Sequence, residues 1–185
     1  MFSKKSLFLA GASILASFLA ALILTSFPGV SGAKPEKPQR CYTISSLQGS
    51  YAIIGNYGAH VAIYLGREYL DGMGNLTGTS LINEPTPGST TGARTLVTGT
   101  EKGTYTVNCD GTGVITRDVT VTGGGTTTGV MDNFVITRAI VKQGQFIATA
   151  VEDAQQVPSV VVPGGIFLTR TWTRLPDHDQ DADSD

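Results

Sequence analysis

Apolar and polar residues alternate along most of the chain in short runs, with the two-residue period that is typical of β-strands. Tyr51, Ile53 and Tyr57 would share one face of the first run. Similar sets recur in three later runs: Val61, Ile63 and Leu65; Phe146, Ala148 and Ala150; Ile166, Leu168 and Trp172. Side chains two residues apart point the same way in a strand, so we predict that each set covers a common core.

Turn-forming residues separate these runs. Gly-Asn, Asp-Gly and Gly-Gly pairs recur between them, as is typical of antiparallel hairpins. No segment after residue 33 keeps the apolar period of an amphipathic helix. The sequence predicts about nine strands, at Ser50–Asn56, Val61–Leu70, Leu76–Ile82, Arg94–Thr98, Gly103–Val107, Gly113–Val121, Phe134–Val141, Phe146–Glu152 and Ile166–Arg174.

The faces opposite these sets are also partly apolar, as Ala52 and Ile54 show in the first run. Such two-sided strands are typical of a barrel or of two packed sheets. We therefore predict an all-β fold, an antiparallel up-and-down barrel of about eight short strands, because closure removes exposed edges. A β-sandwich is the alternative.

Three segments interrupt the alternation. Asn83 to Gly92 contains two prolines and is predicted to be a polar loop. Gly123–Gly125 is expected at a flexible hairpin tip. These glycines do not form a phosphate-binding loop, since neither the lysine nor the following helix of such a loop is present. Pro158 to Gly165 is rich in valine and is expected to be a lid or a crossover rather than a strand.

The first residues resemble a secretory signal. Lys4 and Lys5 precede an apolar stretch, Leu7–Phe27, and small residues lead up to Ala33. We predict that residues 1–33 are a signal peptide, cleaved after Ala33, and that the protein is secreted or periplasmic. The apolar stretch is long enough to span a bilayer, so an N-terminal membrane anchor is the alternative.

Charge excludes one class of partner. The chain has a formal net charge of −2, and its body carries no dense basic patch, so we expect no nucleic-acid binding. Five aspartates occupy residues 177–185, with no lysine or arginine. Because that segment lacks the glycine and glutamate of a calcium loop, we predict a disordered acidic tail. Residues 34–45 would be a linker and residues 46–176 the barrel domain.

Cys41 and Cys109 are the only cysteines. In an exported protein an even pair is typical of a disulfide. A zinc site is the alternative, but two thiols alone lack the further ligands that zinc requires. We therefore predict a Cys41–Cys109 bridge, and no metal site or cofactor.

Three motifs carry a resemblance: Leu47–Tyr51 (LQGSY), Asp71–Thr79 (DGMGNLTGT) and Gly103–Gly113 (GTYTVNCDGTG). Together they resemble a group of uncharacterised secreted bacterial proteins with a small β-barrel of allene-oxide-cyclase-like and lipocalin-like architecture. In that group the cysteine follows an aspartate, whereas Cys109 precedes Asp110. The resemblance implies a barrel and assigns no catalytic residues.

Few residues suggest catalysis. His60 lies near Arg67 and Glu68 in the sequence, which allows an acid–base pair at a barrel mouth, but a surface histidine is the simpler interpretation. Four arginines fall on predicted strands and would either hold a carboxylate or face solvent: Arg117, Arg138, Arg170 and Arg174. No residue is assigned as catalytic.

The sequence leaves three functions open. The first is a secreted barrel that binds a small apolar molecule or aromatic carboxylate. The second is a cell-surface structural or interaction protein, and the third is a cyclase- or isomerase-like enzyme suggested only by the fold resemblance. For the first, the expected lining is aromatic with one histidine: Tyr51, Tyr57, His60, Tyr64, Phe146 and Trp172. The sequence does not predict an oligomeric state.

Overall fold

The computed structural model describes three stretches of the chain, residues 41–159, 162 and 164–176. The chain divides into two compact units, Met1–Lys37 and Pro38–Asp185, and the described residues all belong to the second. The predicted signal peptide and the acidic tail lie outside the described residues, and so does the linker up to residue 40.

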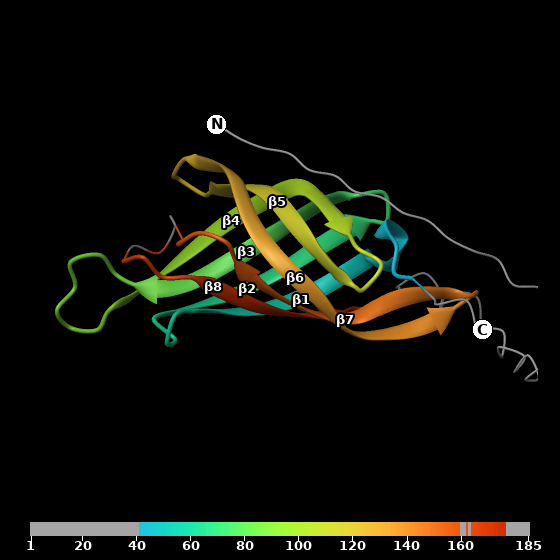
Figure 1. The fold of residues 1–185 in the computed structure, drawn as a ribbon. Coiled ribbons are helices and arrows are strands. Elements are labelled where there is room, and N and C mark those ends of the chain that lie inside the picture. The colour runs from blue at the N-terminus through green and yellow to red at the C-terminus, as the bar shows by residue number, and fades with distance from the viewer. Residues whose placement is uncertain (1–40, 160–161, 163, 177–185) are drawn as a thin grey trace, which may run out of the picture. The chain divides into compact units, whose positions relative to one another are not determined.

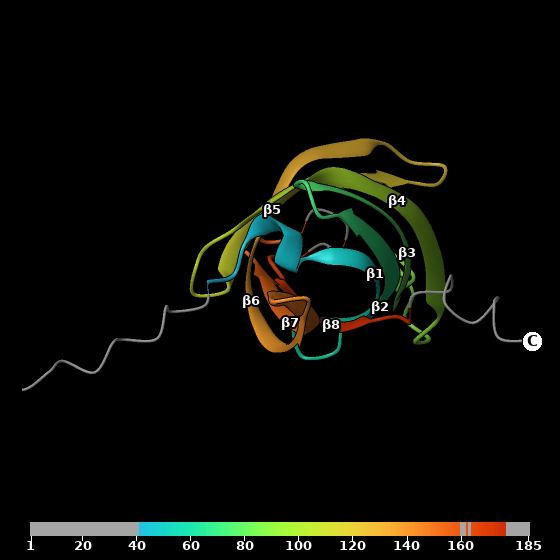
Figure 2. The same cartoon turned by 90° about the vertical axis from the view of Figure 1, so that its right-hand side faces the viewer.

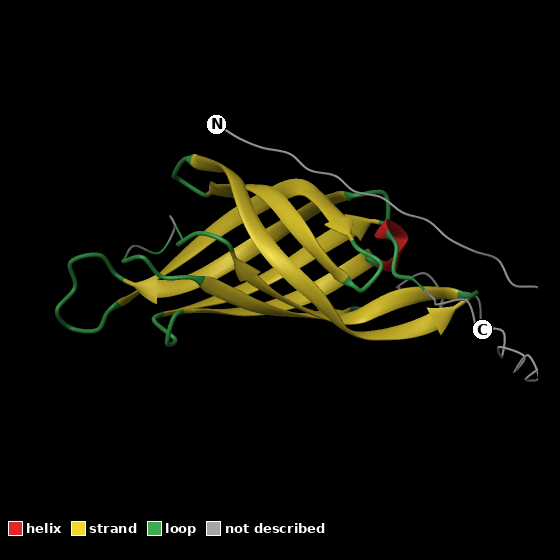
Figure 3. Ribbon diagram, in the orientation of Figure 1, coloured by secondary structure: helices red, strands yellow, loops and turns green. Residues whose placement is uncertain are grey.

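The described part of the chain is almost entirely β-structure (Figure 1, Figure 3). A single short 3-10 helix, η1, precedes eight strands. Their bounds are η1 Ile44–Ser46, β1 Gln48–Tyr57, β2 Ala62–Asp71, β3 Asn75–Pro85, β4 Arg94–Val107, β5 Thr112–Val121, β6 Thr126–Lys142, β7 Gln145–Gln155 and β8 Leu168–Arg174.

Each strand pairs antiparallel with its neighbour in sequence, and β8 returns to pair with β1. The closing ladder runs from Tyr51 opposite Arg174 to Tyr57 opposite Leu168. Figure 2 shows the resulting ring of strands along the barrel. The prediction of a closed up-and-down barrel of about eight strands is confirmed, and a sandwich is excluded.

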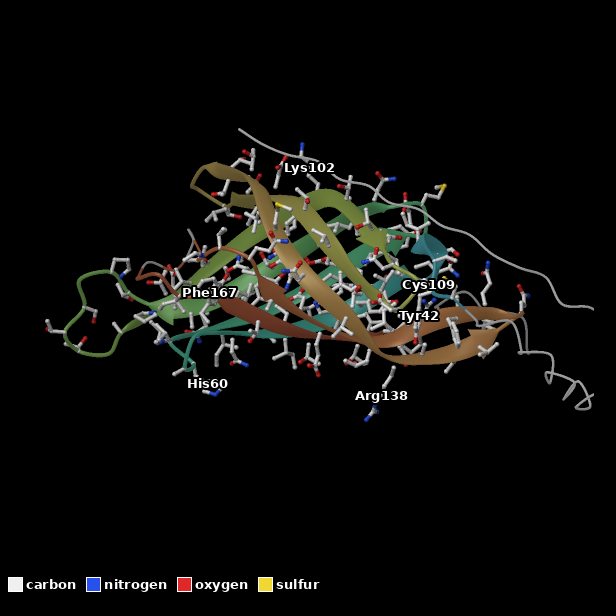
Figure 4. All side chains as sticks on the ribbon, viewed as in Figure 1. Tyr42, His60, Lys102, Cys109, Arg138 and Phe167 are labelled. Carbon is white, nitrogen blue, oxygen red and sulfur yellow. A yellow bond between two sulfur atoms is a disulfide. The ribbon has the colours of Figure 1, made fainter. Side chains whose placement is uncertain are left out.

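The barrel has two ends that differ in their connections. At the end here called the disulfide end lie the β2–β3, β4–β5 and β6–β7 turns, together with η1. At the other end, here called the loop end, lie the β1–β2 turn, the 86–93 loop, the β5–β6 turn and the described residues of the β7–β8 connection. Figure 4 places Cys109 at the disulfide end and His60 and Phe167 at the loop end.

Cys41 and Cys109 form a disulfide, with their Cα atoms 4.6 Å apart, which confirms the predicted bridge. The bridge ties the segment that carries η1 to the β4–β5 turn. Behind η1, Leu47 is buried, and the Tyr105 hydroxyl donates a hydrogen bond of 2.5 Å to its carbonyl oxygen. The segment therefore covers the apolar interior at this end of the barrel (Figure 2).

Two predicted strands, Arg94–Thr98 and Gly103–Val107, form one strand, β4. The separation was wrong because Gly99 and Glu101 resemble a turn in sequence. In the barrel Gly99 instead lies where β5 approaches, and a Cβ there would meet the Thr120 carbonyl oxygen at 2.9 Å. Nine predicted strands thus become eight.

The apolar set expected to cover the core from the second strand faces outward instead, since Ile63 and Leu65 are 42% and 48% exposed. β2 turns Ala62 and Tyr64 inward. Both faces of this strand are apolar, so the alternation alone does not choose between them. Pairing with β1 decides it, because Tyr64 lies opposite Gly55, which is buried.

Two predicted interruptions agree with connections at the loop end. The polar loop begins later than expected, because Asn83 to Pro85 complete β3 opposite β4. Pro158 to Gly165 lies within the β7–β8 connection, and β8 starts at Leu168. Val162 of this connection is only 3% exposed and belongs to the core cluster.

Candidate functional site

Charged side chains occupy the middle of the barrel. β2, β4, β5, β6, β7 and β8 each turn one inward. The six residues, here called the charged layer, are at most 6% exposed: Glu68, Glu101, Arg117, Asp132, Asp153 and Arg170. Charged side chains are seldom buried unless they are paired, so their gathering calls for an account of each contact.

The charged layer follows from the strand alternation. In β8 Arg170 lies between Leu168 and Trp172, which are buried on the same face. In β2 Glu68 precedes Leu70, which is buried toward the disulfide end. The charged residues of β4, β5, β6 and β7 lie at a similar level along the barrel axis. An apolar core therefore lies on the disulfide side of the layer, around Trp172 and Leu70.

Arg170 is fully occupied by its neighbours. Its Nε and Nη2 donate to Asp153 Oδ2 at 2.9 and 2.6 Å, and its Nη1 donates to Glu68 Oε1 at 3.0 Å. Trp172 Nε1 donates to the same Asp153 oxygen at 2.8 Å. The guanidinium carbon also lies 4.9 Å from the centroid of the Trp172 ring. These contacts fix Arg170 against one wall of the barrel.

Arg117 is paired less completely. Its Nη2 lies 3.1 Å from Asp132 Oδ2, and its Nη1 lies 3.2 Å from Glu101 Oε2 and 3.7 Å from Glu68 Oε1. The Tyr64 hydroxyl donates to the other Glu101 oxygen at 2.8 Å. Arg117 therefore faces three carboxyl groups, and its charge is compensated without a ligand.

Carboxyl groups outnumber guanidinium groups by four to two in the charged layer, so full ionisation would leave a charge of −2. Burial raises the pKa of Glu68 well above its usual value, and the charge of Glu101 adds to this. Burial likewise raises the pKa of Asp132 to about 6, although Arg117 opposes the shift. Burial lowers the pKa of Arg117, but Glu101, Asp132 and Glu68 outweigh it, and the net direction is upward. The carboxyl groups of the layer thus tend to bind protons, and Arg117 stays charged.

Several polar atoms of the layer have no hydrogen-bond partner. Oε2 of Glu68, Oε2 of Glu101 and Oδ2 of Asp132 accept none, and Nε and Nη1 of Arg117 donate none. Buried polar atoms without partners are costly, and in native proteins they often mark a bound water, an ion or a catalytic role. Three of these five atoms are acceptors, and the two donors both belong to Arg117.

A cavity of about 150 Å³ extends from the charged layer toward the loop end. Tyr64, Glu101 and Arg117 contribute its polar side, here called the floor. Most of its remaining wall is apolar, with one residue from each of β3, β5, β6 and β8: Ile82, Val119, Val130 and Leu168. We refer to this space as the loop-end cavity.

The β7–β8 connection covers the loop-end cavity through Val157, Pro158 and Ser159. Ser159 is 8% exposed, and its backbone N–H donates to the Ile166 carbonyl oxygen at 2.7 Å. Tyr57 also lines the cavity, and burial raises its pKa to about 12 although a hydrogen bond with Ser159 lowers it. The Tyr57 hydroxyl is therefore neutral at physiological pH.

Four of the six predicted lining residues lie in the barrel interior, but in two places. Tyr57 and Tyr64 line the loop-end cavity. Tyr51 and Trp172 pack against each other, with ring centroids 6.0 Å apart, in the apolar core beyond the charged layer. They fill the interior there rather than enclose a space.

The other two predicted residues lie apart from the loop-end cavity. His60 is exposed in the β1–β2 turn, where its Nδ1 lies 2.7 Å from Asn56 Oδ1 (Figure 4). It does not meet Glu68, which is buried, because a turn residue points away from the barrel axis. Phe146 stacks on Tyr42 at the disulfide end, with ring centroids 4.8 Å apart.

The four arginines lie in different environments, and only Arg138 matches the prediction that they face solvent. Arg117 and Arg170 point inward, each toward carboxyl groups. Arg138 is exposed and points away from the barrel in Figure 4. Arg174 is half-buried beside β1 and donates a hydrogen bond to the Gln48 carbonyl oxygen.

The sequence did not identify the four acidic members of the charged layer as a site. A signal was present, because each charge in β5, β6 and β8 has apolar residues two positions before and after it. Asp132, for example, lies between Val130 and Phe134, which are both buried. A charged residue whose neighbours two positions away are apolar shares their face of the strand, and it is therefore expected to point into the barrel.

A larger hollow, of about 690 Å³, lies outside the barrel at the disulfide end. It is lined by outward-facing residues such as Arg67, Tyr69 and Lys142. No buried polar atom without a partner belongs to it. The loop-end cavity, by contrast, joins two such residues to apolar walls, and it is therefore the candidate site.

Within the described residues no group of histidine, cysteine or acidic side chains could hold a metal ion. Nor do they include a helix of the length and hydropathy needed to cross a membrane. No protein-family model matches the chain, and no match was found among curated proteins or solved structures. The resemblance to the secreted bacterial barrel proteins stays a prediction.

Proposed function

We propose that this chain is a small-molecule-binding barrel that holds one largely apolar or aromatic molecule in the loop-end cavity. The observation that carries this proposal is the composition of the cavity. Its wall is mostly apolar, and its floor offers the ion pair of Glu101 and Arg117, in which Arg117 Nε donates no hydrogen bond. Binding sites for small molecules typically combine apolar walls with a few convergent polar groups.

Stability alone is a poor explanation for the charged layer. Removing charges from water costs several kcal/mol each, and replacing a buried ion pair by apolar residues is often neutral or stabilising. Buried groups with shifted pKa values cluster at functional sites. The raised pKa values of Glu68 and Asp132 are of this kind, and they support a binding role.

The size of the cavity limits the ligand. At about 150 Å³ it is smaller than the pockets that hold drug-sized molecules, which start at roughly 300 Å³. An apolar cavity of about 150 Å³ in another protein binds benzene. The ligand is therefore a single ring or a short branched chain with one polar group.

A cavity-filling variant tests this proposal. Val130→Trp places a large side chain in the loop-end cavity, and Val135→Trp makes the same change on the outward face of β6, where Val135 is 41% exposed. Binding of monocyclic compounds would be measured by thermal shift and by amide chemical shifts. We expect binding to the parent protein and to Val135→Trp, and none to Val130→Trp.

If no compound shifts the melting temperature or the amide signals of the parent protein, the binding proposal fails. The structural or interaction protein of the cell surface would then be the better interpretation of the barrel. Equal binding to the parent protein and to Val130→Trp would place the ligand elsewhere, for example in the hollow at the disulfide end.

An enzyme, cyclase- or isomerase-like, is the second candidate. The observation that favours it is the hydrogen bond from the Tyr64 hydroxyl to Glu101 at the cavity floor. A carboxyl group paired with a phenol can move a proton to or from a bound substrate. Turnover of a compound that binds, abolished in Glu101→Gln, would favour the enzyme.

We also propose that the protein acts after export, as a secreted or periplasmic protein. The disulfide supports this, since such bridges persist mainly in oxidising compartments.

A further inference from the structure

We infer that the loop-end cavity selects an uncharged ligand whose oxygen accepts a hydrogen bond from Arg117, as a ketone does, over ionised ligands of either sign. This inference rests on the proposed binding function and names the polar group of the ligand. Among the described residues that line the cavity, only Glu101 and Arg117 are charged. They pair with each other, since Arg117 Nη1 lies 3.2 Å from Glu101 Oε2. The lining therefore presents no net charge to a ligand.

The surroundings of this ion pair are neutral as well. Burial raises the pKa of Tyr64 well above its usual value, so the hydroxyl at the floor keeps its proton. In the charged layer, burial raises the pKa values of Glu68 and Asp153, which favours their uncharged forms and removes the surplus of negative charge. A charged ligand head would thus be buried without a counter-ion of its own, at a high cost in free energy.

Arg117 retains one donor for a ligand. Its Nη1 faces Glu101, and its Nη2 lies 3.1 Å from Asp132 Oδ2. Its Nε donates no hydrogen bond, although the residue is only 2% exposed. A guanidinium group only donates, so a ligand must bring an acceptor to satisfy this N–H. A carbonyl oxygen does so without adding a charge to the cavity.

An ion of either sign meets a competitor at the floor. An ammonium group would need a carboxylate oxygen, but Glu101 Oε2 already lies 3.2 Å from Arg117 and 3.7 Å from Arg170 Nη1. A carboxylate could accept from Arg117 Nε, but it would lie beside the carboxyl group of Glu101. Arg170 does not compensate that second negative charge, because its Nε and Nη2 are held by Asp153.

The cavity wall fits the remainder of an uncharged molecule. Ile82, Val119 and Leu168 are at most 7% exposed and present only apolar side chains. Between them and the floor there is room for a ring or a short branched chain, at about 150 Å³. A ketone on a single ring matches both the wall and the floor.

Three compounds built on one six-membered ring test the charge preference: cyclohexanone, cyclohexylamine and cyclohexanecarboxylate. Their dissociation constants for the exported protein at pH 7 would be measured by calorimetry and by amide chemical shifts. We expect cyclohexanone to bind at least about tenfold more tightly than either ion. An ion that binds as tightly as cyclohexanone, or more tightly, would overturn the inference and leave the binding function in place.

Arg117→Lys tests the hydrogen bond. Lysine keeps the positive charge beside Glu101 and has a methylene group in the place of Nε. Cyclohexanone should therefore bind about tenfold more weakly to this variant, whereas methylenecyclohexane, which has the same shape and no acceptor, should bind as it does to the parent protein. Arg138→Lys makes the same change at an exposed position of β6 and should affect neither compound.

The outcomes separate this inference from the binding function. If Arg117→Lys weakens both uncharged compounds equally, or neither, the hydrogen bond from Arg117 is overturned and the binding function stands. If none of the four compounds binds the parent protein, the binding function fails with it. If Arg117→Lys does not fold, a crystal structure of the parent protein with cyclohexanone decides instead. A ketone oxygen within hydrogen-bond distance of Arg117 Nε supports the inference, and an oxygen that faces away overturns it.

Discussion

Gly103 of β4 and Gly113 of β5 lie where neighbouring strands leave no room for a side chain. A Cβ on Gly103 would lie 2.2 Å from the Thr116 carbonyl oxygen and 2.7 Å from Arg117 Cα. On Gly113 it would lie 2.1 Å from the Thr106 carbonyl oxygen. Such distances are far below van der Waals contact, so these glycines allow the close approach that seats Arg117 in the charged layer.

Gly103→Ala should therefore lower the free energy of unfolding by about 1–3 kcal/mol, through overpacking and displacement of β5. Gly125→Ala is the matched control, because a Cβ there meets nothing within 4 Å. It should change stability by less than about 0.5 kcal/mol. Urea unfolding of both variants measures the difference, and equal effects would contradict the close approach.

Asp132 should make the stability of the fold depend on pH in the acidic range. Burial raises its pKa from 3.8 to about 6, so the folded state binds more protons than the unfolded state between these values. The free energy of unfolding should then fall as pH rises from about 4 to about 6, by up to about 3 kcal/mol. Burial raises the pKa values of Glu68 and Asp153 as well, which acts in the same direction.

Asp132→Asn should flatten this pH profile, because the asparagine does not titrate. Urea unfolding at a series of pH values, with Glu152→Gln as the exposed control, measures the slope. A parent protein that gains stability over the same pH range would show that Asp132 is ionised in the fold at low pH, contrary to its raised pKa.

At the scale of elements, the segment before β1 is held at the disulfide end from two sides. The disulfide joins it to the β4–β5 turn, and Tyr42 N–H donates to the Cys109 carbonyl oxygen at 3.1 Å. Tyr105 reaches the same segment from β4, through Leu47. The element η1 is too short to be stable alone, so its position depends on these ties.

Replacing both Cys41 and Cys109 by serine should destabilise the barrel. The bridged residues are 68 apart in sequence, and closing a loop of that length corresponds to about 4 kcal/mol in the chain-entropy model. The free energies of unfolding of parent and double variant would be compared with and without reductant. Reductant should lower only the parent's value, and a parent insensitive to full reduction would contradict the role of the bridge.

At the scale of the whole barrel, the interior is divided along its axis. An apolar core fills the disulfide end, the charged layer crosses the middle, and the loop-end cavity lies beyond it. Small barrels of about eight strands either fill their interior with side chains or hold one small ligand. In this barrel side chains fill the interior at the disulfide end, whereas the loop end has space for a small ligand.

The export prediction also belongs to the whole molecule. We expect the exported protein to begin at Lys34, after cleavage of residues 1–33. Its intact mass, measured after recovery from the medium or the periplasm, decides this. A mass that includes the first 33 residues would favour the membrane anchor.

The sequence by itself determined the strands, the hairpins and the bridge. Residues two apart share a face, and turn residues mark where a strand ends, so local chemistry is enough for these features. It was insufficient for β4, where the inward glycines and Glu101 resembled a turn. It also did not decide which face of β2 points inward, since both are apolar.

Only the tertiary structure decided what the interior contains. Glu68 and Arg170 lie 102 residues apart in sequence, and their hydrogen bond depends on the closure of β8 against β1. The two-residue period shows that each charge shares a face with apolar neighbours, but the height at which it lies follows from strand register and tilt. These are properties of the closed barrel, and they bring six separate charges into one layer beneath the loop-end cavity.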